Sequence, residues 1–476
     1  MTVADLNPQY TWAEGDEAPT GVNPPEVQAK VPHPMTDPRF VPKERYYSRE
    51  YFELEKKHLW TKTWQMAARE EELPNPGDYV EYEIVGISVL IVRQKDRSIK
   101  ALHNVCRHRA TELAKGAGRL PGGQLVCPFH GWRWNLDGSS SFVFGEKAFE
   151  PACLNKDDLA LRECLVETWS GMVWINMDLG ARPLSEHLAP VQKLLDGVGV
   201  GNMRVKWWKQ VILNANWKMA QEAFFEGYHV TQTHPQLLMG NDEEYGEKRA
   251  EQVAYTTFKN GHARFQSASK GEVEYEPIYD SSEFIEAGRL LVTGQDAMTL
   301  ENDLRVFEGL RNKIPQDDPH FAQKAIMALY EYAEGAGIPM APMGPAMQLW
   351  GGDIFMFPNY LMLPMYGNCL AYRSRPYKDD PEWVIFDVWS LTTYPRGQEP
   401  ERAELAGVFD KDDTENWGLI PRQDFSNIER QQRGTHSPGF TELRLSSQYE
   451  LSISNMHEEL DRRIASQLGI AARIDE

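Results

Sequence analysis

Two short motifs place two cysteines and two histidines where they could hold one inorganic cluster. One residue separates Cys106 from His108, two residues separate Cys127 from His130, and eighteen residues lie between the two pairs. Turn-forming residues flank the pairs, so two tight loops could face each other. These residues are Pro121, Gly122, Gly123, Pro128 and Gly131. Two thiolates and two imidazoles can hold a [2Fe–2S] cluster, with the cysteines on one iron and the histidines on the other. The motifs therefore predict an electron carrier or a redox enzyme.

Two alternatives compete with an iron–sulfur cluster. A structural zinc site also uses cysteine and histidine, but its paired ligands are usually two to four residues apart. The single residue between Cys106 and His108 fits that spacing poorly. The second alternative is four unrelated residues.

The sequence around the four ligands resembles a known domain. Residues 102–109 and 127–138 are similar to the Rieske domain of the Rieske non-haem iron oxygenases, the family of aromatic-ring-hydroxylating dioxygenase large subunits. The resemblance implies that Cys106, His108, Cys127 and His130 bind a Rieske [2Fe–2S] cluster.

A second group of residues could hold a single metal ion. His229 and His234 are five residues apart, which on a regular helix separates them by about 140°. If both bind one metal, the helix must unwind after His229. The sequence supplies two reasons: two threonines and a valine that follow are poor helix formers, and Pro235 pushes His234 out of the α region. Glu226 lies three residues before His229, on the same side. Two histidines and one carboxylate, with open positions left on the metal, are the ligands of mononuclear Fe(II) oxygenases.

Residues 216–235 resemble the iron-binding helix of the same family, in which two histidines at this spacing are iron ligands. An acidic residue three before the first histidine is the family's electron bridge. It is usually aspartate, whereas this chain has Glu226. The alternative is a pair of histidines with an ordinary surface or core role.

The third ligand should be a carboxylate much later in the chain. Residues 423–434 resemble the family's C-terminal motif, in which an aspartate eight residues before the second glutamine, here Gln432, is the ligand. This implies Asp424. Asp413 is the rival, because other branches of the family carry a paired-aspartate motif that ends in Asn-Trp, as residues 412–417 do here.

The residues that must position these ligands change in pattern along the chain. The proline-rich stretch 1–45 predicts an extended arm that packs on the catalytic domain or on a neighbouring subunit. The pattern over 47–60 predicts a helix, and 79–85 and 87–92 predict antiparallel strands. Residues 172–177 are the last strand of this all-β region or the junction. We predict an arm (1–45), a Rieske domain (46–166) and a catalytic mononuclear iron domain (167–476).

The second half of the chain mixes helices and strands. Residues 281–337 are mostly helical and acidic, with no role assigned. The runs 354–365, 369–377 and 383–394 predict a twisted antiparallel sheet, and residues 443–468 predict a helix that packs on it. These patterns predict an α+β protein. The resemblance implies that it consists of an N-terminal all-β Rieske [2Fe–2S] domain and a helix-grip (START-like) catalytic domain. The glycine run 197–201 follows a helix-like segment, so it reads as a helix end rather than a dinucleotide site.

The composition narrows the class of protein. Fifty basic residues against seventy acidic ones give a net charge of −20, which argues against a nucleic acid or an anionic membrane as partner. Only five cysteines are present, so a disulfide scaffold is not expected. The first residues show no signal peptide and no run approaches eighteen apolar residues. We expect a cytoplasmic protein.

The resemblance implies a terminal oxygenase component. Such a component takes electrons from a ferredoxin and/or an NAD(P)H-dependent reductase and uses O2 to hydroxylate, dihydroxylate or O-dealkylate a hydrophobic ring compound. It implies a homotrimer or a hetero-hexamer with a small subunit, in which the two metals that work together lie in different subunits. The alternatives are a Rieske-type electron carrier without oxygenase chemistry and a regulatory iron–sulfur protein. A carrier leaves about three hundred residues after the cluster domain without a purpose.

The substrate is the least determined feature. Pocket walls could come from seven apolar residues that fit an ordinary core equally well: Met219, Phe224, Phe225, Leu237, Leu238, Phe357 and Leu361. No obvious basic cluster lies near them, which favours a neutral aromatic or alicyclic compound over a dicarboxylate. A single arginine supplied by folding would overturn that preference.

Overall fold

The structure is a computed structural model that describes residues 14–18, 21–238, 243–251, 253–266, 281–318, 320–344 and 352–468. Its contacts divide the chain into two compact units. The smaller unit comprises Leu59–Glu186 and Glu401–Glu404, and the larger unit comprises Met1–His58, His187–Pro400 and Leu405–Glu476. Within the described residues, no helix is long and apolar enough to cross a membrane.

The smaller unit consists mainly of two antiparallel sheets. The seven-stranded sheet has the order β2-β11-β10-β5-β4-β3-β6. Its strands are β2 (Gln65–Arg69), β3 (Asp78–Ile84), β4 (Ile87–Arg93), β5 (Ile99–His103), β6 (Ala117–Arg119), β10 (Glu163–Trp169) and β11 (Met172–Asn176). The three-stranded sheet contains β7 (Gln124–Val126), β8 (Arg133–Asn135) and β9 (Ser140–Phe142). A short helix, α3 (Lys156–Leu159), precedes β10.

Alternation of apolar and polar residues explains the strands of the larger of these two sheets. Along β3, every second side chain is buried and the others face solvent at least in part, as in a half-buried strand. β3 pairs antiparallel with β4, which confirms the two strands predicted for this region. β11 lies inside the sheet, paired with β10 on one side and with β2 on the other. It is therefore the last strand of this sheet in chain order rather than a junction.

The larger unit is built on an eight-stranded sheet with the order β13-β14-β15-β16-β17-β18-β12-β19. All pairs are antiparallel except β12 with β19. The strands are β12 (Met203–Leu213), β13 (Ala254–Thr257), β14 (Ala263–Gln266), β15 (Asp353–Met356), β16 (Tyr360–Met365), β17 (Asn368–Pro376), β18 (Val384–Thr393) and β19 (Leu405–Val408). The run predicted as one strand over 354–365 is two strands, because residues 357–359 form a turn around Pro358.

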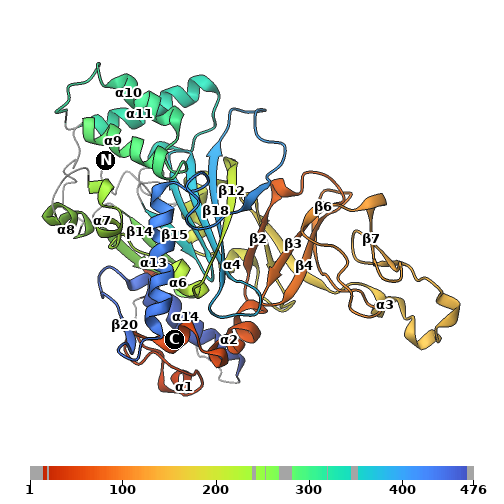
Figure 1. Ribbon diagram of the computed structural model, residues 1–476. Helices are drawn as coiled ribbons and strands as arrows, with labels where there is room; N and C mark the ends of the chain where they lie inside the picture. The colour runs from red at the N-terminus through yellow and green to blue at the C-terminus, as the bar shows by residue number, and fades with distance from the viewer. Residues whose placement is uncertain are drawn as a thin grey trace. The chain divides into compact units, whose positions relative to one another are not determined.

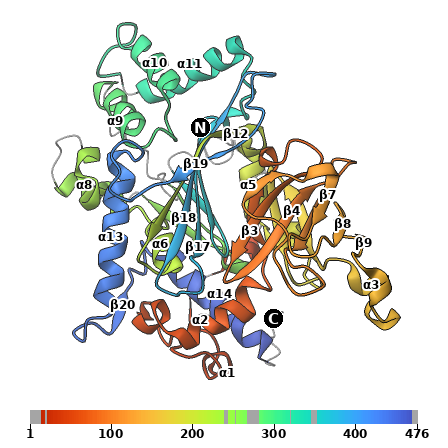
Figure 2. The ribbon, with the colours of Figure 1, turned by 45° about the vertical axis from the view of Figure 1, so that its right-hand side comes forward.

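Helices pack against this sheet. Figure 2 shows α13 (Leu419–Thr435) alongside α6 (Trp217–Glu222) and strands β17 and β18. The helix predicted near the C-terminus is α14 (Leu451–Gln467), which contacts β13 and β14. An antiparallel sheet with helices on it confirms the predicted α+β fold. The remaining short helices are α4 (Leu184–His187), α5 (Val191–Gly197), α7 (Val230–Thr233) and α8 (Glu243–Glu251). Gly199 follows α5 with a φ of +71°, so the glycine run is a helix end, as predicted.

The segment predicted as helical over 281–337 forms three helices that lie together in Figure 1. They are α9 (Ser281–Gly294), α10 (Glu301–Leu310) and α11 (Phe321–Ala336). Ile285, Leu304, Phe307 and Leu329 are among the residues of their shared apolar core. These helices therefore form a small layer with its own core.

The described part of the N-terminal arm packs within the larger unit, against elements near the C-terminus. Strand β1 (Phe40–Pro42) pairs with β20 (Glu442–Arg444) near the other end of the chain. Helix α1 (Pro25–Gln28) contacts α14. The helix predicted over 47–60 begins at Arg49 as α2 (Arg49–Glu55), capped by the side chain of Ser48, and continues as a π-helix to Trp60. The first thirteen residues of the arm lie outside the described residues.

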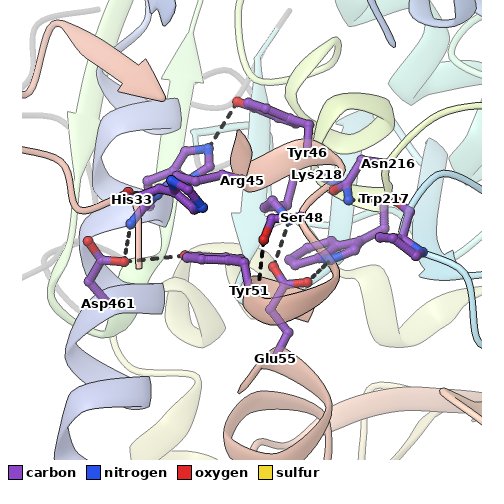
Figure 3. A network of polar contacts seen from close by, with 12 residues as sticks. His33, Arg45, Tyr46, Ser48, Tyr51, Glu55, Asn216, Trp217, Lys218 and Asp461 are labelled. Carbon is purple, nitrogen blue, oxygen red and sulfur yellow. Dashed lines mark hydrogen bonds and ion pairs between the residues drawn. The ribbon is translucent and has the colours of Figure 1, made fainter. Parts of the chain in front are cut away.

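A buried network of polar side chains joins α6 to α2 (Figure 3). Lys218 of α6 forms an ion pair with Glu55 of α2, with 2.6 Å between Nζ and Oε1. The indole N–H of Trp217 donates to the same carboxylate over 3.2 Å. Both charged side chains are fully buried, so removing one partner would leave an uncompensated charge in the core.

The other end of α6 is fastened to α14. The hydroxyl of Tyr46 donates to Glu222 over 2.8 Å, and Nε2 of His457 lies 2.9 Å from the same carboxylate. Burial raises the pKa of Glu222 to about 7, against the lowering effects of the Tyr46 hydrogen bond and the Lys218 charge. The helix that leads to the predicted metal ligands is therefore held at both ends.

Candidate metal centres

The two predicted cluster loops share one hydrogen-bond pattern within the smaller unit. The N–H of Cys106 donates to the carbonyl of Thr111 over 2.8 Å, and the carbonyl of Cys106 accepts from Ala110 over 3.0 Å. Cys127 makes the same two bonds, with the residues five and four positions after it, over 2.8 and 3.0 Å. The fourth residue after each cysteine has a positive φ, +63° at Ala110 and +71° at Gly131. Two tight loops therefore present their side chains in similar ways, as the sequence predicts.

The four side chains form an inner pair and an outer pair. Cys106 and Cys127 are 4% and 2% exposed and belong to the apolar core of the unit. His108 and His130 are partly exposed, and their Nδ1 atoms lie 3.2 Å apart. The ring of Trp132 stacks on His108 with centroids 4.7 Å apart. The histidine edge thus faces outward, where an electron could leave.

These side chains fit a two-iron cluster better than a single ion. One tetrahedral zinc needs all its ligand atoms at about 2.0–2.3 Å from the metal, hence within about 4 Å of one another. Among the described residues, the four atoms do not form one such group within 4.8 Å. Backbone N–H groups also point at the sulfurs, from His108 and Arg109 to Cys106 and from Phe129 and His130 to Cys127. Such bonds stabilise thiolates, which is the form that binds iron.

The second predicted set comes together in the larger unit. His229, His234 and Asp424 each offer one ligand atom, and these atoms lie within 4.8 Å of one another. Oδ1 of Asp424 is 3.0 Å from Nε2 of His234 and 3.7 Å from Nε2 of His229. Asp424 is 5% exposed and His234 is 2% exposed. Two neutral imidazoles and one carboxylate at these distances make a donor set that suits a divalent metal.

The backbone around the histidines differs in one respect from the prediction. Helix α6 ends at Glu222, and one turn of helix, α7, follows His229. The sequence did not predict the break between α6 and α7, which comes before His229. The helical turn ends at Thr233, and His234 lies outside the α region with φ −120° and ψ 61°, as predicted from Pro235. Glu226 explains the local order, since its Oε2 accepts the backbone N–H of His229 over 2.8 Å.

Side chains behind the histidines fix which ring nitrogen faces the carboxylate. Oε1 of Glu226 lies 2.7 Å from Nδ1 of His229, and Oε1 of Gln423 lies 2.9 Å from Nδ1 of His234. The Gln423 oxygen also accepts from Gln236 over 2.8 Å. Because both oxygens accept a hydrogen bond from Nδ1–H, both Nε2 atoms are left free to bind a metal. Sequence reasoning missed Gln423, although it stands next to Asp424 in the motif.

The charges around His229 favour its protonated form when no metal competes. Burial lowers the pKa of His229, but the hydrogen bond to Glu226 and the charges of Glu226 and Asp424 outweigh it, so the pKa is raised. A divalent cation at Nε2 would take the place of that proton.

Asp413, the rival third ligand, accepts hydrogen bonds within its own turn. Its carboxylate accepts the backbone N–H groups of Glu415 and Asn416 over 2.9 and 3.0 Å, and the side-chain amide of Asn416 over 2.9 Å. These bonds lower the pKa of Asp413 and order the turn before α13. Asp413 is not part of the group that includes the two histidines.

The larger unit contains a cavity of about 270 Å³. Its walls come from β12, β17 and β18, from the end of α9, and from residues 414–421 at the start of α13. Pro421 lines it, and Asp424 stands three residues later on α13, hence on the same helix face. None of the seven apolar residues considered as pocket walls lines this cavity. Phe224 instead stacks on Tyr372 at 4.2 Å, and Phe225 packs on Phe355 at 4.2 Å.

Comparison with known proteins identifies two domains in this chain. The family model of the ring hydroxylating alpha subunit (catalytic domain) matches residues 200–466, and that of the Rieske [2Fe-2S] domain matches residues 63–145. The fold and sites define a protein with a Rieske domain followed by a catalytic domain. The chain belongs to the ring hydroxylating alpha subunit family, as the sequence motifs predict.

Individual relatives differ in how much of the chain they match. The carnitine monooxygenase oxygenase subunit of Acinetobacter pittii is 31% identical over 196 residues, 41% of this chain and 52% of that protein. The chain therefore spans about half the length of the first curated relatives that it matches. The glycine betaine monooxygenase oxygenase subunit of Pseudomonas aeruginosa is 24% identical over 436 residues, 90% of each chain.

A solved structure shows the same fold. Naphthalene 1,2-dioxygenase with indole bound in its active site superposes with a TM-score of 0.62 at 19% identity, covering 90% of this chain and 92% of the other. The two matched families imply a Rieske [2Fe–2S] cluster and a mononuclear iron, the two cofactors predicted from the sequence.

Proposed function

We propose that this chain is the terminal oxygenase component of a Rieske non-haem iron system. It takes electrons from a ferredoxin and/or an NAD(P)H-dependent reductase and uses O2 to hydroxylate, cis-dihydroxylate or O-dealkylate a hydrophobic ring compound. Cys106, His108, Cys127 and His130 are its cluster ligands. His229, His234 and Asp424 are its iron ligands.

One observation carries the proposal: a single chain holds both a Cys/His quartet and a separate His/His/Asp group. An electron carrier needs only the first. In the second, the two Nε2 atoms and the carboxylate of Asp424 converge, while Glu226 and Gln423 hold the two Nδ1 atoms. When bound, the cluster supplies single electrons and the mononuclear iron supplies the reaction with O2.

The protein's own contribution is orientation and exclusion of water. Glu226 and Gln423 set the tautomers and ring planes of the histidines, as carboxylates and carbonyls do around metal sites generally. Asp424 sits on the long helix α13, whose buried face packs on the rest of the unit, so its carboxylate is held on a rigid element. Phe224, stacked on Tyr372, adds an apolar layer to the same face of the sheet.

We propose that Glu226 also bridges two subunits. Each oxygen of its carboxylate has one hydrogen bond to His229, and each keeps a further lone pair. His108 or His130 of the partner subunit would use it. Glu226→Gln should leave both metals bound and slow single-turnover electron transfer from cluster to iron. An unchanged single-turnover rate would remove the bridge.

The proposed partners and setting follow the same logic. Rieske oxygenase alpha subunits assemble as multimers and receive electrons from another protein; we propose a homotrimer, or a hetero-hexamer with a small subunit, in the cytoplasm. The substrate is a small hydrophobic aromatic or alicyclic compound. Neither nucleic acid nor a membrane is a proposed partner, since the net charge is −20.

Iron and sulfide analysis tests the function directly. An oxygenase should contain about three irons and two acid-labile sulfides per chain, whereas a carrier should contain about two of each. The purified protein, supplied with a ferredoxin and its reductase, should consume O2 in proportion to ring substrate oxidised. A colourless protein that holds only zinc would refute the proposal.

A further inference from the structure

The cavity of the larger unit contains a lysine that forms no ion pair with a described residue. Lys209 lines it from β12, and among the described residues its ammonium has no acidic partner within 4.0 Å. The ammonium donates a hydrogen bond to the backbone carbonyl of Asn416, over 2.5 Å. By contrast, Lys206, three residues earlier on the strand, pairs with Asp296 at 2.5 Å.

The same ammonium lies over the rings of two tryptophans that line the cavity. Nζ of Lys209 lies 4.7 Å from the ring centroid of Trp207 and 5.7 Å from that of Trp417. Aromatic faces of this kind attract cations, including the quaternary ammonium groups of ligands. Because the protein's own lysine already covers both rings, a cationic ligand would have to displace it.

Two further polar groups of residues that line the cavity have no hydrogen-bond partner among the described residues. They are the indole Nε1 of Trp417 and Oε1 of Gln295, and both are buried. Buried polar groups are usually paired, so two unpaired ones around one cavity point to a ligand that completes them.

The sheet register places Lys209 in one row with Tyr372. Lys209 lies opposite Val388, and Val388 lies opposite Tyr372, so these side chains form one row across the same face of the sheet. The Cα atoms at the two ends of the row are roughly 10 Å apart, two strand spacings. Tyr372 is the end nearer Asp424, whose charge contributes, after burial, to the raised pKa of the phenol.

The acidic residues of the cavity do not cancel this cation. Asp296 is held by Lys206, and Glu415 is exposed at the rim. Burial lowers the pKa of Lys209, against the charges of Asp296 and Asp413, which means that the ammonium would gain from an additional negative partner.

We propose that Lys209 binds an oxyanion, a carboxylate or a sulfonate, on the ring substrate. The ring then extends along the row toward Tyr372 and the proposed iron. This inference rests on the proposed oxygenase function, whose substrate class it narrows to ring acids.

Binding of matched probes to the metal-loaded protein tests the inference without turnover. Benzoate, benzenesulfonate, neutral benzamide and cationic benzyltrimethylammonium share one ring and differ in charge. Calorimetric titration should show benzoate or benzenesulfonate binding about 10- to 100-fold more tightly than benzamide, the range expected for one charge-assisted hydrogen bond. Equal affinities for the acids and the amide would overturn the inference.

Substitution of the lysine should change the two charged probes in opposite directions. Lys209→Met should weaken the acids about 10- to 100-fold and tighten benzyltrimethylammonium, because both tryptophan faces are freed. Lys209→Gln removes the charge with a polar side chain if the first variant fails to fold, and Lys209→Arg should keep the preference for acids. Lys193→Met, at an exposed position of α5, is the charge-matched control and should change nothing.

The outcome separates this inference from the proposed function. Loss of acid and amide binding to the same extent in folded Lys209→Gln would refute the role of the charge while leaving the iron content untouched. If metal analysis instead finds no third iron, the oxygenase function fails even where Lys209 still selects acids.

Discussion

The two proposed metal centres of this chain are assembled in opposite ways. The four proposed cluster ligands fall within 25 residues, on two loops with the same internal hydrogen bonds. The proposed iron ligands come from two segments nearly two hundred residues apart, and the elements that support them include α2, α6, α13 and α14. A locally built centre depends on its own turns, whereas a centre built from distant segments depends on the packing that brings them together.

The burial of the two centres also differs. The cluster pairs run from a buried cysteine side to a partly exposed histidine edge. At the other centre, His234 and Asp424 are nearly inaccessible, and Glu226 is 8% exposed. The first geometry suits electron exchange with other proteins, and the second suits chemistry from which water is kept away.

The largest expected effect is loss of the local centre. Cys127→Ser should abolish the visible absorption of the cluster, because a serine hydroxyl is a poor substitute for a thiolate on iron. The larger unit should still bind one Fe(II), since none of its ligands is altered. Loss of both metals together would contradict the independence of the two centres.

The converse variant tests the centre built from distant segments. Asp424→Ala should remove the mononuclear iron and lower substrate oxidation at least about a hundredfold, an estimate for a lost metal ligand, with the cluster spectrum unchanged. Asp413→Ala is the matched control, because Asp413 only orders a turn. Iron counts and spectra of the two variants should therefore differ; equal iron counts would reopen the choice of ligand.

A smaller effect is expected from the residue behind His234. Gln423→Leu removes the oxygen that accepts from Nδ1 of His234, so Fe(II) affinity should fall roughly 10- to 100-fold. Gln423→Glu keeps an acceptor and should retain most of the affinity. Competition with a chelator measures both, and a leucine variant with normal affinity would show that packing alone orients the ring.

The smallest expected effect on activity concerns the buried network behind α6, which changes stability instead. The pKa of Glu222 is raised from 4.5 to about 7 in the folded chain, so the folded state holds the proton that the unfolded state releases. Its contribution is therefore fully present below pH 4.5 and is lost as the pH rises to about 7. The loss is on the order of 3 kcal/mol for 2.5 pKa units. Glu222→Gln should flatten the decline in melting temperature between pH 5 and 7.5, and an equally steep decline would refute the assignment.

Much of the fold was predictable because its signals are local. Alternation along β3 and β4 and the helical spacing of residues 451–464 each depend on a few neighbouring side chains. The run 354–365 was not divided correctly, since its apolar residues continue through the turn at Pro358. The break before His229 was also missed, because the capping of that turn by Glu226 is a side-chain contact and not a property of residue types.

The sequence by itself determined the kinds and spacing of the ligands, because thiolates, imidazoles and carboxylates carry their chemistry with them. Only the tertiary structure decided that Asp424 rather than Asp413 meets the histidines and that Gln423 hydrogen-bonds to one of them. It also decided that Lys209 lines the cavity without an ion pair to any residue that the structure describes. The physical reason is distance along the chain. Contacts between residues two hundred positions apart depend on how sheets and helices pack, and no short pattern of residues records them.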